Sequence, residues 1–265
     1  MQLTVKHTTE YSYHEPVSFA LQQVRLHPLD STLQTVGHWS LDIEGGVIET
    51  SYRDHHGNHV DLVSATPGSQ RLTIVATGEV ETNDAAGVLG RVYGRAPLWY
   101  FKQMTPVTLA GPGIQQVAKV IGAHDNQLDG FHALSAAILE AVPYEGGHTD
   151  AKTTAEEAVG VAKGVCQDHA NIFISAARAM GLPARYVSGY LLMDDRVDQD
   201  ASHAWAEVHL DDLGWVGFDV SNGVSPDHRY IRIAIGRDAH DAAPIHGLRG
   251  GAGDESLIVS LQVQQ

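Results

Sequence analysis

Three residues in the second half of this chain have the types and the order needed for covalent catalysis by a thiol. Cys166 is the only cysteine, and His203 and Asp219 follow it. A thiol nucleophile needs an adjacent base, usually an imidazole, which is in turn oriented by a third group such as a carboxylate. Free cysteine has a pKa of about 8.5, so an active site must favour its thiolate at neutral pH. The sequence therefore predicts Cys166 as nucleophile, His203 as base and acid, and Asp219 as the orienting carboxylate.

The residues around Cys166 predict that it lies in the first turn of a helix. The segment Gly164-Val165-Cys166 precedes an apolar helical stripe, and Gly181 and Pro183 follow as helix terminators. At a helix start, unpaired N–H groups and the dipole favour an anion, and they can also stabilise an oxyanion. The backbone N–H of Cys166 is one candidate oxyanion donor, and Tyr144 and Gln167 are further candidates.

His203 and Asp219 lie on two predicted strands that form a hairpin, His203–Leu210 and Trp215–Val220. Both side chains can share a face of the hairpin only if the numbers of two residues that lie opposite each other on the two strands add up to an even number. Pairing His209 with Trp215 places Asp219 diagonal to His203, about 7–8 Å away at the backbone. A one-residue slip would send Asp219 to the opposite face. We therefore predict a hairpin that turns over the odd-numbered segment Leu210–Gly214.

Each of these residues also has a simpler interpretation. An isolated cysteine is often a small buried hydrophobe, and a single histidine is more often structural than catalytic. His169 and His209 are rival bases for the thiol. The direction of His169 is fixed by the cysteine's own helix, and His209 lies at the end of its strand, far from Asp219. The ordered set of three, each in a suitable local element, favours catalysis.

The alternation of apolar residues divides the chain into regions. Residues 1–82 keep a period of two between turns rich in glycine and proline, which predicts a small antiparallel β domain. Residues 83–105 are interpreted as a linker. Residues 106–265 contain helices followed by strands, so the predicted fold class is α+β, with helices packed on an antiparallel sheet.

Within residues 106–265, a stripe from Ile114 to Ile121 and a segment from Phe131 to Ala141 predict two helices. Thr153 and Thr154 offer a capping box in two registers, so a short helix is expected to begin there. The strands predicted after the cysteine's helix are Arg185–Leu192, His203–Leu210, Trp215–Val220, Tyr230–Ile235 and Leu257–Val263. The glycine-rich segment Gly247–Gly253 lacks the Lys-Ser/Thr end of a phosphate loop and is predicted to be a mobile loop.

The composition is that of a globular protein, with 43% hydrophobic and 18% charged residues. A formal net charge of −15 argues against nucleic acid and anionic membrane surfaces as partners. One cysteine and an N-terminus without the apolar run of a signal peptide favour a cytoplasmic location. The sixteen histidines are scattered without HExxH or a compact His/Asp cluster, so no metal and no cofactor are expected.

The chain resembles the bacterial transglutaminase-like cysteine proteins of the papain-like superfamily. The resemblance is carried by the segments around Thr153-Thr154, Gly164-Val165-Cys166-Gln167-Asp168, Gly181–Tyr190, Ser202–Val208 and Gly214–Asp219. A weaker match, at Tyr11-Ser12-Tyr13, Arg25–Pro28 and Gly57-Asn58, is to the β region that precedes this core. The resemblance implies Cys166, His203 and Asp219 as catalytic residues. One departure is Asp219-Val220-Ser221-Asn222, where the family usually has Asp-Pro-Thr/Ser-Asn.

Several functions are compatible with these residues. Thiolate attack on an amide or peptide carbonyl gives a thioester, which water or an amine then captures. We favour capture by water, which makes a cysteine protease or amidase acting on a protein or peptide. Capture by a lysine would instead give a cross-linking protein-glutamine gamma-glutamyltransferase. Acyl transfer to a small amine, as in arylamine acetyltransferases, is a third possibility, and a non-enzymatic interaction module is a fourth. An intact set of three residues counts against the interaction module.

Overall fold

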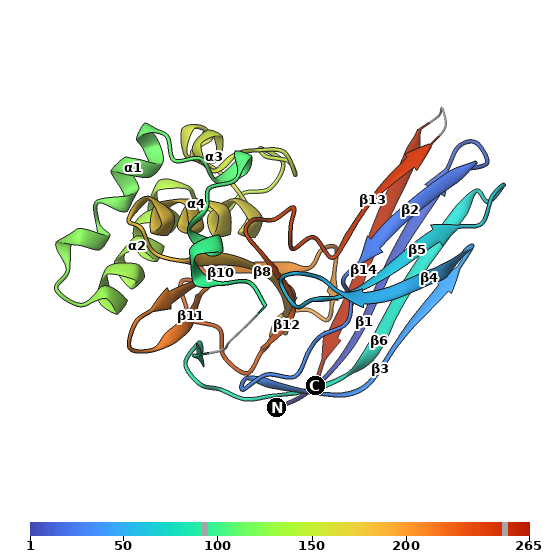
Figure 1. Ribbon diagram of the computed structural model, residues 1–265, viewed down its shortest axis with the longest axis horizontal. Helices are drawn as coiled ribbons and strands as arrows, with labels where there is room; N and C mark the ends of the chain where they lie inside the picture. The colour runs from blue at the N-terminus through green and yellow to red at the C-terminus, as the bar shows by residue number, and fades with distance from the viewer. Residues whose placement is uncertain (92–94, 251–253) are drawn as a thin grey trace.

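Strands from both ends of the chain build a β-sandwich (Figure 1). In the computed structural model, which describes residues 1–91, 95–250 and 254–265, two antiparallel sheets form this half. One sheet has the order β3-β6-β1-β14-β9 and the other β13-β2-β5-β4. The strands are β1 (Gln2–Tyr13), β2 (Phe19–Val24), β3 (Gln34–Glu44), β4 (Gly46–Arg53), β5 (His59–Ala65), β6 (Arg71–Thr82), β9 (Asp198–Gln199), β13 (Ile245–Gly250) and β14 (Glu255–Gln264).

Alternating burial explains why these segments form strands of a sandwich. In β1 and β6 nearly every second residue is buried, as period-two patterning requires. The side chains between the sheets form one apolar cluster, which includes Tyr11, Val63, Leu72 and Ile74. The predicted antiparallel β region is thus present in the N-terminal part of the chain.

The last two strands pair with the first two, in contrast to the assignment of all of residues 106–265 to the core. β14 pairs with β1 from Thr4↔Gln264 to Tyr13↔Glu255, and β13 pairs with β2. The two ends of the chain therefore meet in Figure 1. The segment Gly247–Gly253 was expected to be a mobile loop, but its residues 247–250 belong to strand β13. Its residues 251–253 lie outside the described residues. Alternation predicts a strand but does not name its partner, which is why the pattern alone assigned these strands to the core.

The segment interpreted as a linker is also part of the structure. Its strand β7 (Val88–Gly90) pairs with β11 (Gly214–Phe218), and a 3-10 helix, η1, follows at Leu98–Lys102. Residues 92–94 of this segment lie outside the described residues. The predicted linker therefore contributes an edge strand to the second half of the molecule.

The second half is a five-stranded antiparallel sheet with helices on one face (Figure 1). The strand order is β12-β8-β10-β11-β7. The α+β prediction is confirmed, because the helices precede an antiparallel sheet instead of alternating with parallel strands. The other elements are α1 (Pro112–Ala118), α2 (Gln127–Ala141), α3 (Ala155–Val161), α4 (Cys166–Ala179), β8 (Ala184–Leu191), β10 (His203–Leu210), β12 (Tyr230–Gly236), η2 (Pro106–Thr108) and η3 (Ile121–Ala123).

Helix α4 packs on the sheet through residues whose spacing the sequence shows. Its Ile172, Phe173 and Ala176 share a buried cluster with the even-numbered residues of β10, such as Ala206 and Val208. The odd-numbered residues of β10 face away from this cluster. Helix α3 begins with a capping box in the register of Thr154, whose hydroxyl accepts from the Glu157 N–H. Among the described residues, no helix has the length and apolar content needed to cross a bilayer.

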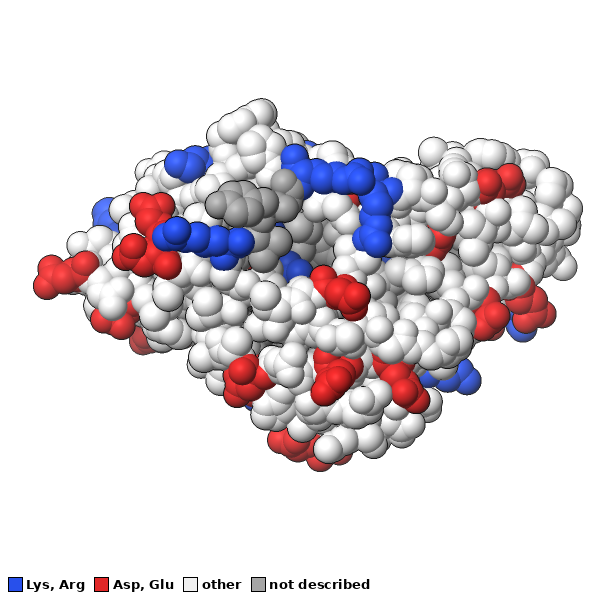
Figure 2. Space-filling view, turned by 60° about the horizontal axis from the view of Figure 1, so that its bottom comes forward, with Lys and Arg blue, Asp and Glu red and all other residues white. Residues whose placement is uncertain are grey.

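The two halves of the molecule share a hydrophobic cluster of their own. Leu3, Val5 and Val263 of the sandwich pack against Tyr190 and Ile231 of β8 and β12. A buried hydrogen bond between His7 Nδ1 and the Tyr190 hydroxyl, at 2.8 Å, crosses the same boundary. On the face drawn in Figure 2, several Lys and Arg border the central hollow, and Asp and Glu are scattered over the left, lower and right parts of the face. Charges of both signs therefore occur on this face despite the net charge of −15.

Candidate active site

Cys166 is the first residue of α4, as predicted. The preceding residue, Val165, has extended backbone, and its N–H donates to the Asp168 carboxylate at 2.8 Å. The first N–H groups of a helix have no partner within the helix, so they point outward at its start. The Cys166 side chain is partly exposed and touches the apolar cluster beneath α4. The thiol therefore lies at the protein surface beside a helix N-terminus.

The β10–β11 hairpin has the predicted register. His209 pairs with Trp215 and Leu210 with Gly214, so the connection turns over an odd number of residues. Gly214 has φ +75°, a conformation that glycine adopts without strain, and a Cβ there would lie 2.3 Å from the Gly90 backbone. Gly214 thus begins β11 in this conformation, directly after the three loop residues 211–213. Continuing the register beyond Phe218 places Asp219 diagonal to His203.

The side chains of His203 and Asp219 are in direct contact. His203 Nε2 lies 2.7 Å from Asp219 Oδ2, and the Asp219 side chain has no exposed surface. Because Nε2 faces the carboxylate, Nδ1 is the nitrogen left for the thiol. Cys166 is close enough to His203 that its side chain contributes to the raised pKa of the imidazole. The structure therefore brings all three predicted residues together in the predicted order.

The electrostatic surroundings favour the charged form of His203. Burial opposes protonation, but the hydrogen bonds to Asp219 and Cys166 outweigh it and raise the pKa of His203 from 6.5 to about 10. For Asp219, burial opposes ionisation, while hydrogen bonds from His203, Asn222 and Tyr230 lower its pKa. The site thus holds an imidazolium against a buried carboxylate at neutral pH.

Two further side chains hold the carboxylate in place. The Tyr230 hydroxyl and the Asn222 amide each donate to Asp219 Oδ2 at 2.7 Å. Asn222 belongs to the segment that departs from the family pattern, and it keeps the family's Asn. Tyr230 was not predicted from the sequence, because nothing in its local sequence distinguishes it from any other strand tyrosine.

The face of β10 that carries His203 is packed closely. Gly189 lies opposite His203 on β8, and a Cβ there would lie 2.1 Å from the Ile231 carbonyl oxygen and 2.5 Å from the Trp205 ring. Further along, Glu207 is buried and pairs with Arg185 at 2.6 Å and with Arg232 at 2.8 Å. Only glycine fits where Trp205 covers β8, so this packing fixes the strand that presents the histidine.

A cleft of about 680 Å³ opens beside His203. Volumes of this size are typical of ligand sites. Its lining combines the triad histidine with residues from the end of β8, the following loop and the segment after β11: Tyr144, Leu191, Leu192, Met193, Asp194, Asp195, Arg196, His203, Ser221, Asn222, Val224, Arg229 and Tyr230. The cleft has polar and apolar walls and gives a substrate access to the site.

The three candidate oxyanion donors have different surroundings. The Cys166 N–H is at the start of α4. Tyr144 lines the cleft and is 56% exposed, and burial together with the nearby Cys166 and Asp219 raises the pKa of its hydroxyl. The side-chain amide of Gln167 donates to the Asp150 carbonyl at 3.4 Å. The structure thus leaves Tyr144 facing the cleft and engages Gln167 elsewhere.

The rival histidines have other contacts. His169 Nε2 lies 2.7 Å from the Val142 carbonyl and Nδ1 lies 2.8 Å from the Ser221 hydroxyl. The carbonyl of Val142 can only accept, so Nε2 carries a proton and Nδ1 accepts from the Ser221 hydroxyl. Burial lowers the pKa of His169. His209 lies at the other end of β10, where it lines a separate cavity of about 350 Å³ with Trp215. Neither nitrogen of His169 is left for the thiol, and His209 faces a different cavity.

Comparison with known proteins assigns the chain to a family. Residues 115–220 match the transglutaminase-like superfamily, and residues 3–81 match the bacterial transglutaminase-like N-terminal region. The chain belongs to the transglutaminase-like superfamily. The core match spans Cys166, His203 and Asp219, and the N-terminal match covers the first six strands of the sandwich.

Relatives of similar length occur in mycobacteria. An uncharacterized protein of Mycobacterium leprae is 27% identical, with 99% of this chain and 98% of the relative covered. One from Mycobacterium tuberculosis is 30% identical, with 98% and 91% covered. A crystal structure from Cytophaga hutchinsonii, described as a putative cysteine protease, superposes with a TM-score of 0.80 at 23% identity and covers 100% of this chain and 90% of that one. This transglutaminase-like member therefore shares its whole architecture with a solved protein.

Proposed function

We propose that this protein is a cysteine hydrolase that cleaves amide or peptide bonds through a thioester on Cys166. The observation that carries the proposal is the 2.7 Å contact of His203 with the buried Asp219, beside Cys166 at the start of α4. A binding module would not need a thiol, an imidazole and a buried carboxylate in this order. Family membership supports the same general chemistry.

The first half-reaction forms the thioester. With its proton on His203, where Asp219 stabilises it, the sulfur of Cys166 attacks the carbonyl carbon. The Cys166 N–H and the Tyr144 hydroxyl are the proposed donors to the resulting oxyanion. When the tetrahedral intermediate collapses, the C–N bond breaks and His203 gives its proton to the leaving amine. The enzyme is then an acyl-thioester with a neutral histidine.

The second half-reaction hydrolyses the thioester. Neutral His203 accepts a proton from water, and the oxygen attacks the thioester carbonyl. Collapse of this intermediate breaks the C–S bond, releases a carboxylic acid and returns Cys166 and His203 to their starting state. The exposure of Tyr144 and the partial exposure of Cys166 support water as the acceptor, because solvent reaches the thioester from the cleft.

The cleft lining supports an extended substrate such as a protein or peptide segment. Leu191 and Met193 offer apolar contacts, whereas Asp194, Asp195 and Arg229 offer charges of both signs. A backbone segment with mixed side chains fits such walls better than a uniformly charged or uniformly apolar ligand. The proposal includes the cytoplasmic location, because a reducing compartment keeps Cys166 as a thiol.

The test uses a library of glutamine-containing peptides with and without a primary amine. We expect new termini or ammonia in the absence of amine, and no turnover by Cys166→Ala or His203→Ala. His209→Ala is the matched control, because it changes a histidine at the other end of the same strand and should retain turnover. Product formation that requires the amine would refute the hydrolase and indicate a cross-linking transglutaminase instead. Turnover by Cys166→Ala would refute the thiol mechanism altogether.

A further inference from the structure

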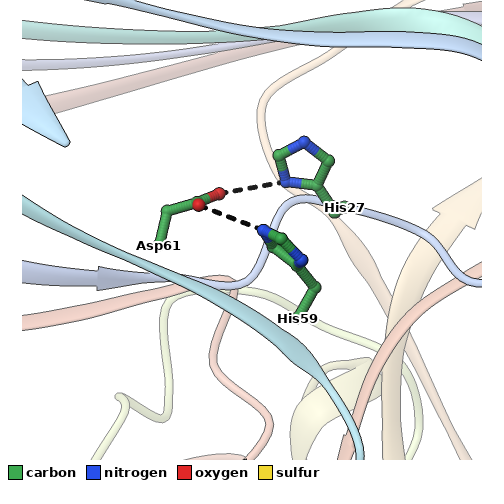
Figure 3. A group of neighbouring side chains, drawn as sticks. All are labelled: His27, His59 and Asp61. Carbon is green, nitrogen blue, oxygen red and sulfur yellow. Dashed lines mark hydrogen bonds and ion pairs between the residues drawn. The ribbon is translucent and has the colours of Figure 1, made fainter. Parts of the chain in front are cut away.

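His27, His59 and Asp61 lie together in the β-sandwich, away from the residues that line the cleft. One donor atom from each lies within 4.8 Å of the other two (Figure 3). His59 and Asp61 are two residues apart on β5 and share a face, and His27 follows β2, the neighbouring strand. The scattered histidines of the sequence did not predict this group, because His27 joins it only through strand pairing.

The carboxylate lies at the margin of the apolar interior. Asp61 is on the same face of β5 as Val63 and Ala65, which belong to the cluster between the two sheets. Its side chain is 3% exposed, whereas His27 and His59 are 26% and 27% exposed. A buried carboxylate is costly without a compensating cation. The two partly exposed histidines separate this carboxylate from solvent.

The contacts of Asp61 do not satisfy it fully. Oδ1 accepts from the Ser51 hydroxyl at 2.5 Å and lies 3.0 Å from His59 Nε2. Oδ2 lies 3.0 Å from His27 Nδ1, yet these two buried atoms are not aligned as a hydrogen bond, and both are without a hydrogen-bond partner. Among the residues that the structure describes, the ion pairs of Asp61 are with histidines alone. An unsatisfied carboxylate oxygen and an imidazole nitrogen side by side are what a shared cation would join.

The ligand types of the group suit a metal. Two imidazoles and one carboxylate are ligands that Zn²⁺ and similar divalent ions prefer. In a tetrahedral zinc site, bonds of roughly 2.0–2.1 Å place donors about 3.4 Å apart. The two His–Asp contacts measure 3.0 Å, and the three donor atoms lie within 4.8 Å of one another, so an ion would draw the partly exposed imidazoles toward this spacing.

We propose that His27 Nδ1, His59 Nε2 and a carboxylate oxygen of Asp61 form a binding site for a divalent transition-metal ion, with Zn²⁺ as the expected ion. The ion would join β5 to the segment after β2, while Ser51 on β4 holds the carboxylate from the other side. Binding would stabilise the sandwich, because the ligands come together only in the folded chain. The site is independent of the thiol chemistry.

The test is a zinc titration of the full-length chain after treatment with chelator. The parent carries Cys166→Ala, so that the triad thiol does not bind the ion. We expect one Zn²⁺ per chain by equilibrium dialysis and a rise in melting temperature with added zinc. Adding His59→Ala or Asp61→Asn should weaken binding by at least about 100-fold, since even partners of metal ligands contribute 10–100-fold. His38→Ala, which removes an exposed histidine of β3, should bind as the parent does.

Two results would overturn the site: a parent that binds no zinc, or ligand variants that bind as tightly as the parent. Circular dichroism of each variant shows whether it folds. If Asp61→Asn does not fold, His59→Gln carries the test, because that side chain is partly exposed and its loss does not leave a cavity in the core. If the three residues only contact one another and bind no metal, zinc will not change the melting temperature of the parent or of any variant, and the proposal is wrong.

Discussion

Asp219→Asn should make the thiol of Cys166 less reactive at mildly acidic pH. The carboxylate accepts from His203 Nε2 at 2.7 Å in surroundings with almost no solvent. A hydrogen bond to a charged group contributes roughly 1.5–3 kcal/mol. The amide has the same shape but lacks the charge that stabilises the imidazolium. We therefore expect the rate of alkylation by iodoacetamide at pH 6 to fall by roughly 10- to 150-fold, with a smaller deficit at pH 9.

The matched control is Asp211→Asn, in the exposed loop of the same hairpin, which should alkylate at the parental rate. His203→Ala should lose at least as much reactivity as Asp219→Asn, and the double variant should lose no more than His203→Ala, since Asp219 acts through the histidine. Near-ultraviolet circular dichroism of Trp205 reports whether the packing beside the site survives. If Asp219→Asn folds and alkylates like the parent at both pH values, the carboxylate does not tune the site and our reasoning is wrong.

Three further predictions concern packing and charge. Gly189→Ala should lower kcat/KM at least about tenfold and destabilise the fold by about 1–3 kcal/mol through overpacking. The control Gly160→Ala, in open space on α3, should be neutral or stabilising by about 0.5–1 kcal/mol. Equal effects of the two substitutions would contradict the packing argument. The folded-state pKa of His203, about 10, exceeds its unfolded value of 6.5, so the stability that it contributes is complete below pH 6.5 and disappears as the pH rises toward 10. In urea, the free energy of unfolding of the parent should exceed that of His203→Ala by up to about 5 kcal/mol at pH 6, and this difference should narrow by pH 10. A difference that stays constant with pH would contradict the raised pKa. Glu207→Gln breaks a buried pair with two arginines and should cost about 3–5 kcal/mol in chemical denaturation, with Glu44→Gln as an exposed control that should cost almost nothing.

The hairpin was predictable because its geometry follows from counting. A period of two fixes which residues share a face, and the turn at Asp211–Gly214 limits the register to a few choices. Only the choice that brings His203 and Asp219 together is consistent with catalysis, and the structure has that register. The start of α4 at Cys166 was predictable for a similar reason, since a glycine and an apolar stripe are local features.

Features that depend on distant pairing were not predictable from one sequence. The partner of β14 is decided by which edge of the sandwich is free, and no local pattern encodes this. Tyr230 contacts Asp219 because β12 lies beside β8, and His27 meets Asp61 because β2 lies beside β5. In each case the residue type is ordinary and its neighbour is supplied by the tertiary fold.

The pairing of β1 with β14 has a consequence for folding during synthesis. Strand β14 lies between β1 and β9, so the first sheet lacks an interior strand until the residues of β14 have left the ribosome. Contacts of such high sequence separation slow folding, and an unpaired β1 edge is exposed meanwhile. The helical half, from β7 to β12 with the exception of β9, is topologically an insertion into the sandwich and can acquire its own core first. A chain truncated before β13 should therefore keep the triad's local elements while exposing the edges of both sandwich sheets, which makes aggregation its expected fate.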